Sequence, residues 1–149
     1  MIKKIIYTSG TFDILNEGHI NVLQGAKALG DYLIVGISTN RLIKSYKLIN
    51  PIMNFKERSK IINALKVVDK VIVQRDFFNV KQLSKYNIST IVLGDDWKNK
   101  PFKELYVAVK QLHCKLVFLP YTQSTSSSNI KRRIIKHAVE ILESKNKRI

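Results

Sequence analysis

Short apolar runs alternate with helical patterns along the whole chain, and this alternation constrains the fold more than any other feature. The expected strands cover 4–8, 32–38, 71–73, 90–93 and 116–119. The expected helices cover 20–29, 54–68, 80–86, 102–112 and the region that begins at 126–128. Strands that alternate with helices form βαβ units, in which the strands are parallel and helices cover both faces of the sheet. The sequence therefore predicts an α/β protein with a five-stranded parallel sheet and a polar loop at 40–51.

The composition suits a single domain that spans residues 1–149. The chain has 149 residues, 45% of them hydrophobic, which is enough for a core of ordinary size. No apolar run approaches the ~20 residues that cross a bilayer, and the N-terminal segment is not typical of a signal peptide. Cys114 is the single cysteine, so it has no partner for an internal disulfide. We expect a cytoplasmic protein with no metal-ligand cluster and a frayed tail at 145–149.

The chain is strongly basic. Its 26 Lys and Arg against 11 Asp and Glu give a net charge of +15. Such a charge attracts polyanions, which include nucleic acids, nucleoside triphosphates and phosphorylated metabolites. The basic residues are scattered over every expected element, and no zinc-finger or RNP-type motif accompanies them. A nucleic-acid-binding module is therefore the weakest interpretation, and we expect no specific nucleic-acid partner.

Four loops that follow expected strands should meet at one edge of the sheet, namely 10–19, 40–51, 94–97 and 121–128. In parallel sheets, ligands bind beyond the carboxyl ends of the strands, where the strand order reverses. The first loop leads through Gly10 and Gly18 into a helix, so free backbone N–H groups and the positive end of the helix dipole can cradle a phosphate there. His19 falls in the first turn of that helix and can donate to the same phosphate.

Four segments carry a family resemblance. They are Gly10-Thr-Phe-Asp-Ile-Leu-Asn-Glu-Gly-His19, Gly30-Asp-Tyr-Leu-Ile-Val-Gly-Ile-Ser-Thr39, Gly94-Asp-Asp-Trp97 and residues 122–130. They resemble, in order and nearly in spacing, segments of the nucleotidyltransferase family that includes glycerol-3-phosphate cytidylyltransferase, over roughly residues 3–136. The resemblance implies a Rossmann-like single domain. It also implies a reaction in which a substrate phosphate attacks the α-phosphorus of a nucleoside triphosphate and pyrophosphate leaves.

The same resemblance assigns roles to individual residues. His19 matches the second histidine of the family signature, and Asn16 stands where the first is expected. Lys47 matches a catalytic lysine, although Lys44 could serve instead after a loop shift. The other implied nucleotide contacts are Gly10, Thr11, Phe12, Asp96, Trp97, Ser126 and Ser127. Lys66 and Asp13 are the implied acceptor contacts, and no residue is assigned to a metal.

Three positions depart from the family pattern. Asn16 can donate a hydrogen bond from its amide but cannot carry a proton or a charge. Tyr121 stands where an arginine is expected beside the triphosphate, so a permanent charge is lost there. Lys66 stands in place of another arginine, and lysine keeps the charge but loses the bidentate fork.

The favoured interpretation is a cytidylyltransferase that works as a homodimer. It would transfer CMP from CTP, with Mg²⁺, to a small phosphorylated alcohol, and glycerol 3-phosphate is the first candidate. The Gly94–Trp97 loop favours CTP. Two alternatives stay open: an adenylyltransferase relative that uses ATP, and a non-enzymatic nucleotide-binding descendant, which Asn16 and Tyr121 support.

Overall fold

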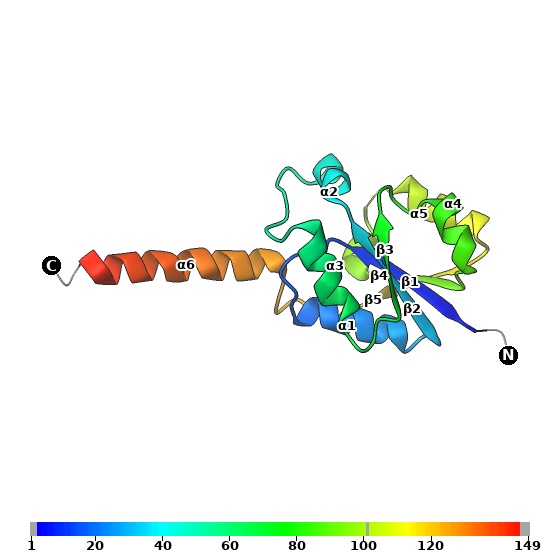
Figure 1. Cartoon of the computed structure of the whole chain (residues 1–149), viewed down its shortest axis with the longest axis horizontal. Coiled ribbons are helices and arrows are strands. Elements are labelled where there is room, and N and C mark those ends of the chain that lie inside the picture. Colours follow the sequence, from blue (N-terminus) through cyan, green and yellow to red (C-terminus); the bar gives the residue numbers. More distant parts are fainter. Residues whose placement is uncertain (1–2, 101, 147–149) are drawn as a thin grey trace.

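The computed structural model describes residues 3–100 and 102–146, and its centre is one parallel sheet (Figure 1). The strands are β1 (Ile5–Gly10), β2 (Tyr32–Ser38), β3 (Lys70–Gln74), β4 (Thr90–Gly94) and β5 (Lys115–Leu119). They lie in the order β3-β2-β1-β4-β5, and every neighbouring pair is parallel. The chain builds outward from β1 to one side and then crosses back to β4. The crevice beyond the carboxyl ends of β1 and β4 is therefore the expected ligand position.

Helices cover both faces of the sheet, which confirms the predicted Rossmann-like α/β fold (Figure 1). One face carries α1 (Glu17–Lys27) and α3 (Phe55–Asn63). The other face carries α4 (Val80–Leu83) with the 3₁₀ turn η1 (Ser84–Tyr86), and α5 (Lys103–Gln111). The 3₁₀ turn η2 (Asp95–Trp97) follows β4 directly. The capping box that the sequence indicates is present, because Asn54 and Glu57 bond each other's backbone N–H groups.

The strands alternate their side chains between two hydrophobic layers, as the pleat of a sheet requires. Ile6, Leu33 and Val35 pack toward α1 and α3 and are completely buried. Tyr7 and Ile34 point to the opposite layer, where they meet α4 and α5. Both faces of the central strands are apolar, because helices exclude water from both.

The region after β2 differs from the prediction, because a helix occupies the first half of the expected loop. Helix α2 (Asn40–Tyr46) begins at Thr39, whose side chain accepts a hydrogen bond from the N–H of Leu42 at 3.2 Å. Leu42 and Ile43 are buried beneath it, which holds this short helix at the carboxyl end of β2. The interpretation of 40–51 as an irregular loop was therefore wrong for residues 40–46.

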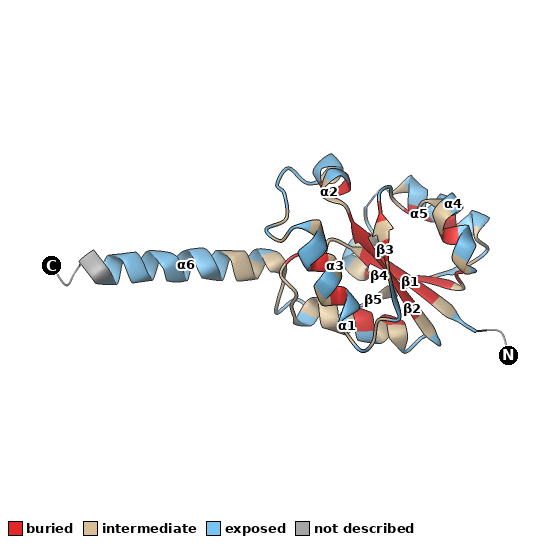
Figure 2. Ribbon diagram, in the orientation of Figure 1, coloured by how far each residue is buried: buried red, intermediate tan, exposed pale blue. Residues whose placement is uncertain are grey.

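The last helix, α6 (Ser127–Asn146), leaves the body of the protein and projects outward over most of its length (Figures 1 and 2). The sequence pattern predicts Ile130, Ile134, Val139 and Leu142 as the apolar positions of this helix. Ile130, at its base, is half-buried, and the other three are exposed. The helix continues through Asn146, and residues 147–149 lie outside the described residues, so the frayed tail at 145–149 stays a prediction. Among the helices of the described residues, none is long and apolar enough to cross a membrane.

Candidate active site

Asn16 organises the start of α1. Its side-chain oxygen accepts from the N–H of Gly18 at 3.0 Å, which makes it the N-cap of the helix. Its amide donates to the carbonyl of Ile14 at 2.9 Å and reaches the hydroxyl of Ser127 at 3.4 Å. The Asn16 amide is thus committed to shaping the Gly10–His19 loop, in which Phe12 and Ile14 both have positive φ.

The segment before α6 closes over the start of α1. The carbonyl oxygen of Thr125 comes within ordinary contact distance, 3.4 Å, of the position that a Cβ of residue 18 would take. The hydroxyl of Ser127 donates to the carbonyl of Asp13, and Asn21 donates to Thr122 at 3.0 Å. Ser126 accepts from the N–H of Asn129 at 3.1 Å and so caps α6. Both implied serines therefore lie at the cradle, and both also hold structure together.

His19 lies in the first turn of α1, as the sequence predicts, with its ring packed on Phe12 at a centroid distance of 5.3 Å. Its Nδ1 is buried and finds no hydrogen-bond partner among the described residues. A buried N–H without a partner is rarer than an unpaired acceptor, so the favoured tautomer carries its proton on Nε2. His19 is then a neutral hydrogen-bond donor beside the N-terminus of α1.

The environment keeps His19 neutral. Its pKa is lowered to about 4, mainly by burial; Asp13 acts in the opposite direction, and Lys47 adds to the lowering. A neutral imidazole suits the cradle, because the helix N-terminus already supplies positive potential there.

The depressed pKa of His19 predicts a pH dependence of stability. Between pH 6.5 and about 4, the unfolded chain binds a proton at this histidine that the folded chain does not. The free energy of unfolding should therefore fall as the pH falls through this window, by at most about 3 kcal/mol, and be fully present above pH 6.5. Urea titrations at several pH values should give a flatter profile for His19→Asn. The exposed His113→Asn is the matched control, and an equally flat profile for that variant would contradict the assignment.

The carboxylate of Asp13 is engaged in bonds to other residues of the same chain. It accepts from the N–H groups of Ile52 and Met53 at 3.0 and 2.9 Å, and it pairs with Lys131 of α6 at 2.7 Å. Burial would raise its pKa, but Lys131 and the two amides outweigh burial and hold the pKa below its usual value. Asp13 thus joins the cradle to the 52–53 segment and to the first turns of α6, so its implied acceptor contact would have to compete with these bonds.

Arg58 lies beneath the loops at the carboxyl edge of the sheet, here called the rim, and connects them. It is completely buried, although it stands in the first turn of α3. Its guanidinium donates to the carbonyls of Thr11 and Ser38 at 2.7 and 2.9 Å, to the Asn40 side chain at 2.7 Å and to the carbonyl of Met53 at 3.1 Å. One side chain therefore fixes the ends of β1 and β2, the start of α2 and the 52–53 segment relative to one another.

An aromatic pocket of about 310 Å³ opens on the same rim, lined by Tyr46, Lys47, Trp97, Lys100 and Phe102. The rings of Trp97 and Phe102 lie 4.8 Å apart between centroids. The ammonium of Lys100 lies 4.7 Å from the centre of the Trp97 ring and 3.1 Å from the Asp96 carboxylate. A flat wall of aromatic rings with a carboxylate beside it can stack a nucleobase and accept from an exocyclic amino group.

Lys47 joins the aromatic pocket to the cradle. It lines the pocket, and it lies close enough to His19 and Asp13 to interact with both. Although the residue is exposed, partial desolvation of its ammonium lowers its pKa, and Lys100 and Lys131 lower it further. Lys44 and Lys47 are both exposed, but Lys44, on α2, does not line the pocket. The geometry therefore favours Lys47 over Lys44 as the lysine of the site.

Two of the singled-out residues take no part in this cluster. Lys66 lies on the exposed connection that leads into the amino end of β3, whereas the cleft lies beyond the carboxyl ends. The structure therefore does not bring Lys66 together with the other implied site residues of the same chain. Tyr121 is exposed, and its backbone N–H donates to Asp95 at 3.0 Å.

Sequence reasoning missed Arg58, Lys131 and Tyr46. Tyr46 shares a hydrogen bond of 3.1 Å with the hydroxyl of Thr11, which adds a second link between α2 and the first loop. Lys131 could have been suspected from its place one turn after Ser127, at the start of the last helix. Arg58 lies on the same face of α3 as Phe55 and Ile62, and no sequence pattern marks an arginine on such a face as buried.

The fold and the site together are typical of nucleotide-binding α/β proteins, with a helix N-terminus that can hold a phosphate and an aromatic pocket that can stack a base. The chain belongs to the Cytidylyltransferase-like family, whose sequence profile matches residues 7–133. It is a nucleotidyltransferase enzyme, as the sequence predicts.

Individual relatives and a solved structure agree with this family. The chain is 39% identical over 136 residues to glycerol-3-phosphate cytidylyltransferase of Bacillus subtilis, covering 89% of this chain and 98% of that protein. It is 35% identical over 136 residues to an FAD synthase of Korarchaeum cryptofilum, covering 88% and 91%. A lipopolysaccharide core biosynthesis protein of Thermoplasma volcanium superposes with a TM-score of 0.68 at 26% identity, covering 81% of this chain and all of the other.

Proposed function

We propose that this enzyme transfers CMP from CTP to a small phosphorylated alcohol, with glycerol 3-phosphate as the first candidate. The observation that carries the proposal is Lys47, which borders both the aromatic pocket and the cradle at His19. A nucleotide whose base lies in the pocket would have its phosphates at the start of α1. The similarity to a glycerol-3-phosphate cytidylyltransferase over nearly its whole length supports the choice of substrates.

The reaction needs positioning and charge stabilisation more than covalent chemistry. An oxygen of the acceptor phosphate attacks the α-phosphorus of CTP, a new P–O bond forms, and the bond to the leaving pyrophosphate breaks. The N–H groups at the start of α1 and the Nε2–H of His19 would donate to the oxygens on which charge develops. The nucleotide and the acceptor are both anions, so the Lys47 ammonium would attract both and offset their mutual repulsion.

Mg²⁺ would accompany the triphosphate. Among the described residues, no group of three or more His, Cys, Asp and Glu side chains could hold a metal ion. Asp13 is already paired with Lys131 and Asp96 with Lys100, so the carboxylates near the cleft are engaged. This setting suits an ion that binds phosphate oxygens and retains its waters, and Mg²⁺ does both. When bound, it would neutralise charge on the leaving pyrophosphate.

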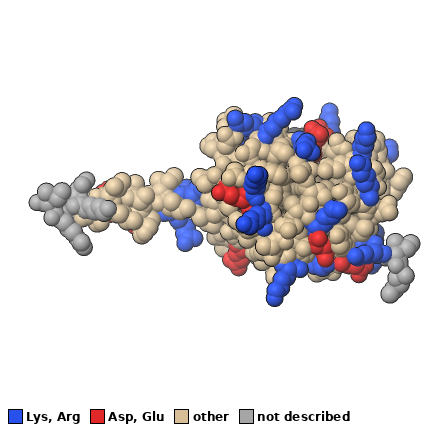
Figure 3. All heavy atoms as spheres, viewed as in Figure 1, with Lys and Arg blue, Asp and Glu red and all other residues tan. Residues whose placement is uncertain are grey.

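In this proposal, the positive charge of the protein attracts its anionic substrates. Lys and Arg side chains are spread over the visible face instead of gathering in one stripe (Figure 3). Lys47, Lys100 and Lys131 gather at the cleft itself, where they influence one another. We propose that the field draws two anionic small molecules to a homodimeric enzyme of the cytoplasm, and that any nucleic-acid binding is weak and falls steeply with salt.

The Trp97 pocket should select cytosine, and ligand binding can test this. Ligand that binds only the folded state stabilises it, by about 2.7 kcal/mol at 100 times the Kd. For a chain of this size, that corresponds to about 2–4 °C in Tm per kcal/mol. Mg-CTP should therefore raise Tm by several degrees more than Mg-GTP does. It should also quench the fluorescence of Trp97, the only tryptophan in the sequence. An equal shift with Mg-GTP would contradict a cytosine-reading pocket, and a larger shift with Mg-ATP would favour the adenylyltransferase alternative.

A further inference from the structure

The cleft must hold a second anion, and the residues implied for it do not supply a complete site. In the proposed reaction the acceptor brings its own phosphate to a nucleotide whose phosphates lie at the start of α1. Of the two implied acceptor contacts, Lys66 lies at the opposite edge of the sheet. Asp13 lies at the cradle, but its carboxylate is negative, and its side chain is only 5% exposed. An acceptor phosphate on the Asp13 side of the cradle therefore needs a cation from another part of the chain.

Lys131 is a cation in this position. It stands in the second turn of α6, its side chain is 31% exposed, and its ammonium lies 2.7 Å from the Asp13 carboxylate. An ammonium carries three N–H donors. Asp13 is the acceptor that this ammonium contacts among the described residues, so two donors remain for water or for a ligand.

The position of Asp13 does not depend on Lys131 alone. Its carboxylate also accepts from the N–H groups of Ile52 and Met53, and its carbonyl accepts from the hydroxyl of Ser127. Asp13 is therefore a fixed anchor for the Lys131 ammonium. Lys131 in turn neutralises the Asp13 carboxylate, which would otherwise repel an approaching phosphate.

A second ammonium faces the same space. Lys131 is close enough to Lys47 for its positive charge to lower the Lys47 pKa. Lys47 also borders the cradle at His19. With the Asp13 charge cancelled, an anion between Lys47 and Lys131 would relieve the repulsion between their like charges. The cleft thus offers an anion position beside the one at the helix start.

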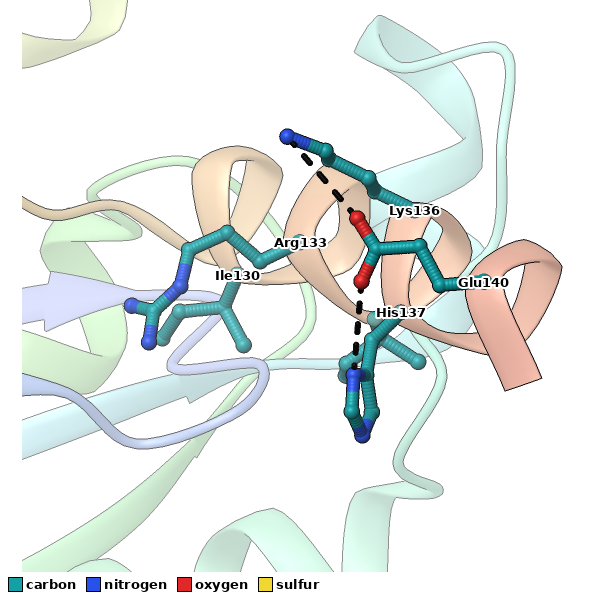
Figure 4. A pocket seen from close by; sticks show the side chains of 6 residues that line it. Ile130, Arg133, Lys136, His137 and Glu140 are labelled. Carbon is teal, nitrogen blue, oxygen red and sulfur yellow. Dashed lines mark ion pairs between the residues drawn. The ribbon is translucent and has the colours of Figure 1, made fainter. Parts of the chain in front are cut away.

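Lys131 differs from the other described basic residues of α6 in its contact with the body of the protein. Lys131 is half-buried, whereas residues 132–144 are all exposed. Lys136 lies about 140° from Lys131 around the helix. There Glu140 lies 4.0 Å from the Lys136 ammonium and 3.8 Å from Nδ1 of His137 (Figure 4). Lys136 is therefore a matched control for a loss of charge on the same helix.

We propose that Lys131, together with Lys47, binds the phosphate of the acceptor, and that the second substrate of this site is a phosphate monoester. This inference rests on the proposed nucleotidyl transfer and names the residue that recognises its second substrate. Two N–H groups of Lys131 would donate to the phosphate while the third stays on Asp13. Asp13 is then a positioning residue, which holds the ammonium without itself contacting the phosphate.

Steady-state kinetics with Mg-CTP and glycerol 3-phosphate test this role. Lys131→Met should raise the KM for glycerol 3-phosphate by about 10–100-fold, the usual loss for one charge-assisted hydrogen bond, and leave the KM for CTP nearly unchanged. Lys131→Arg should recover most of the loss, because it keeps the charge, and Lys136→Met should behave like the wild type. A KM that rises for CTP and not for glycerol 3-phosphate would place Lys131 at the triphosphate. A lower Tm with both KM values unchanged would leave only a structural ion pair, and either result would overturn the proposal.

Binding of inorganic phosphate needs no turnover, so it separates this proposal from the proposed reaction. In the nitrogen-15-labelled wild type with Mg-CTP present, phosphate should shift the amide signals of Ile52 and Met53, which contact Asp13. The affinity should fall by about tenfold or more in Lys131→Met and stay unchanged in Lys136→Met. Phosphate binding of this kind without any CMP-linked product would refute the proposed transfer and retain the Lys131 site. No shift in the wild type, or equal affinities in the wild type and Lys131→Met, would refute the Lys131 site.

Discussion

The His19→Asn enzyme should release pyrophosphate about 10²–10³-fold more slowly than the wild type, while its fold and its melting temperature at neutral pH stay close to normal. The histidine lies at the start of α1, where backbone N–H groups and the helix dipole already favour an anion. Its Nε2–H is the side-chain donor that reaches the same region. Losing one preorganised donor in a low-dielectric site removes transition-state stabilisation that water cannot replace.

The measurement is the steady-state rate of pyrophosphate release with the nucleotide and acceptor at saturation. His113→Asn is the matched control, because His113 is exposed and its positive φ suits asparagine. Binding of Mg-CTP, followed through Trp97, should change much less than turnover does. Equal turnover in the His19→Asn and wild-type proteins would remove His19 from the site.

Arg58→Met should lower the free energy of unfolding by about 3–5 kcal/mol, the largest stability loss we expect from a single substitution. The guanidinium is fully buried and donates to three carbonyls and one side-chain oxygen in four segments. Methionine fills a similar volume but leaves those acceptors without donors. Since Thr11 and Ser38 then lose their common anchor, the cleft should loosen and turnover should fall with stability.

Urea denaturation gives this stability difference directly. Arg58→Lys should recover part of the loss, because lysine keeps the charge but cannot reach all four acceptors. The exposed Arg41→Met removes an arginine from α2 at little cost and serves as the control. An Arg58→Met protein as stable as Arg41→Met would show that the buried bonds do not hold the rim together. Failure of the Arg58→Met protein to fold would lie in the expected direction.

The periodic parts of the fold could be predicted from the sequence. Strand β2 is found at the predicted residues, because a buried parallel strand is a continuous apolar run. The start of α3 follows from the Asn54–Glu57 capping box, which is a local interaction that needs no tertiary context. The placement of His19 in the first helical turn follows in the same way from the strand, the turn and the helix around it.

The non-periodic parts could not be predicted, and each has a physical reason. Helix α2 is too short to show a helical period, and burial of Leu42 and Ile43 stabilises it. Arg58 looks like an ordinary surface residue until the fold brings four acceptors around it. The apolar pattern of α6 correctly indicates a helix, but a pattern cannot say whether the apolar face packs on its own chain.

The site shows the same division between local and tertiary information. The resemblance selects Asn16, and the structure shows why an asparagine can stand there: it caps α1 and shapes the cradle. It also selects Lys66, whose position at the other edge of the sheet becomes visible only when the strands are assembled. The non-enzymatic alternative depended on Asn16 and Tyr121, whereas family membership shows a nucleotidyltransferase enzyme.

Product analysis tests the central claim most directly. The wild-type enzyme would be incubated with Mg²⁺, glycerol 3-phosphate and one nucleoside triphosphate at a time, and its products separated and identified by mass. We predict one pyrophosphate for each molecule of CMP joined to glycerol 3-phosphate, with CTP at least tenfold faster than ATP or GTP, and loss of both products in His19→Asn. Pyrophosphate release from ATP at the same rate or faster, or no CMP-linked product with CTP, would contradict the proposed cytidylyl transfer.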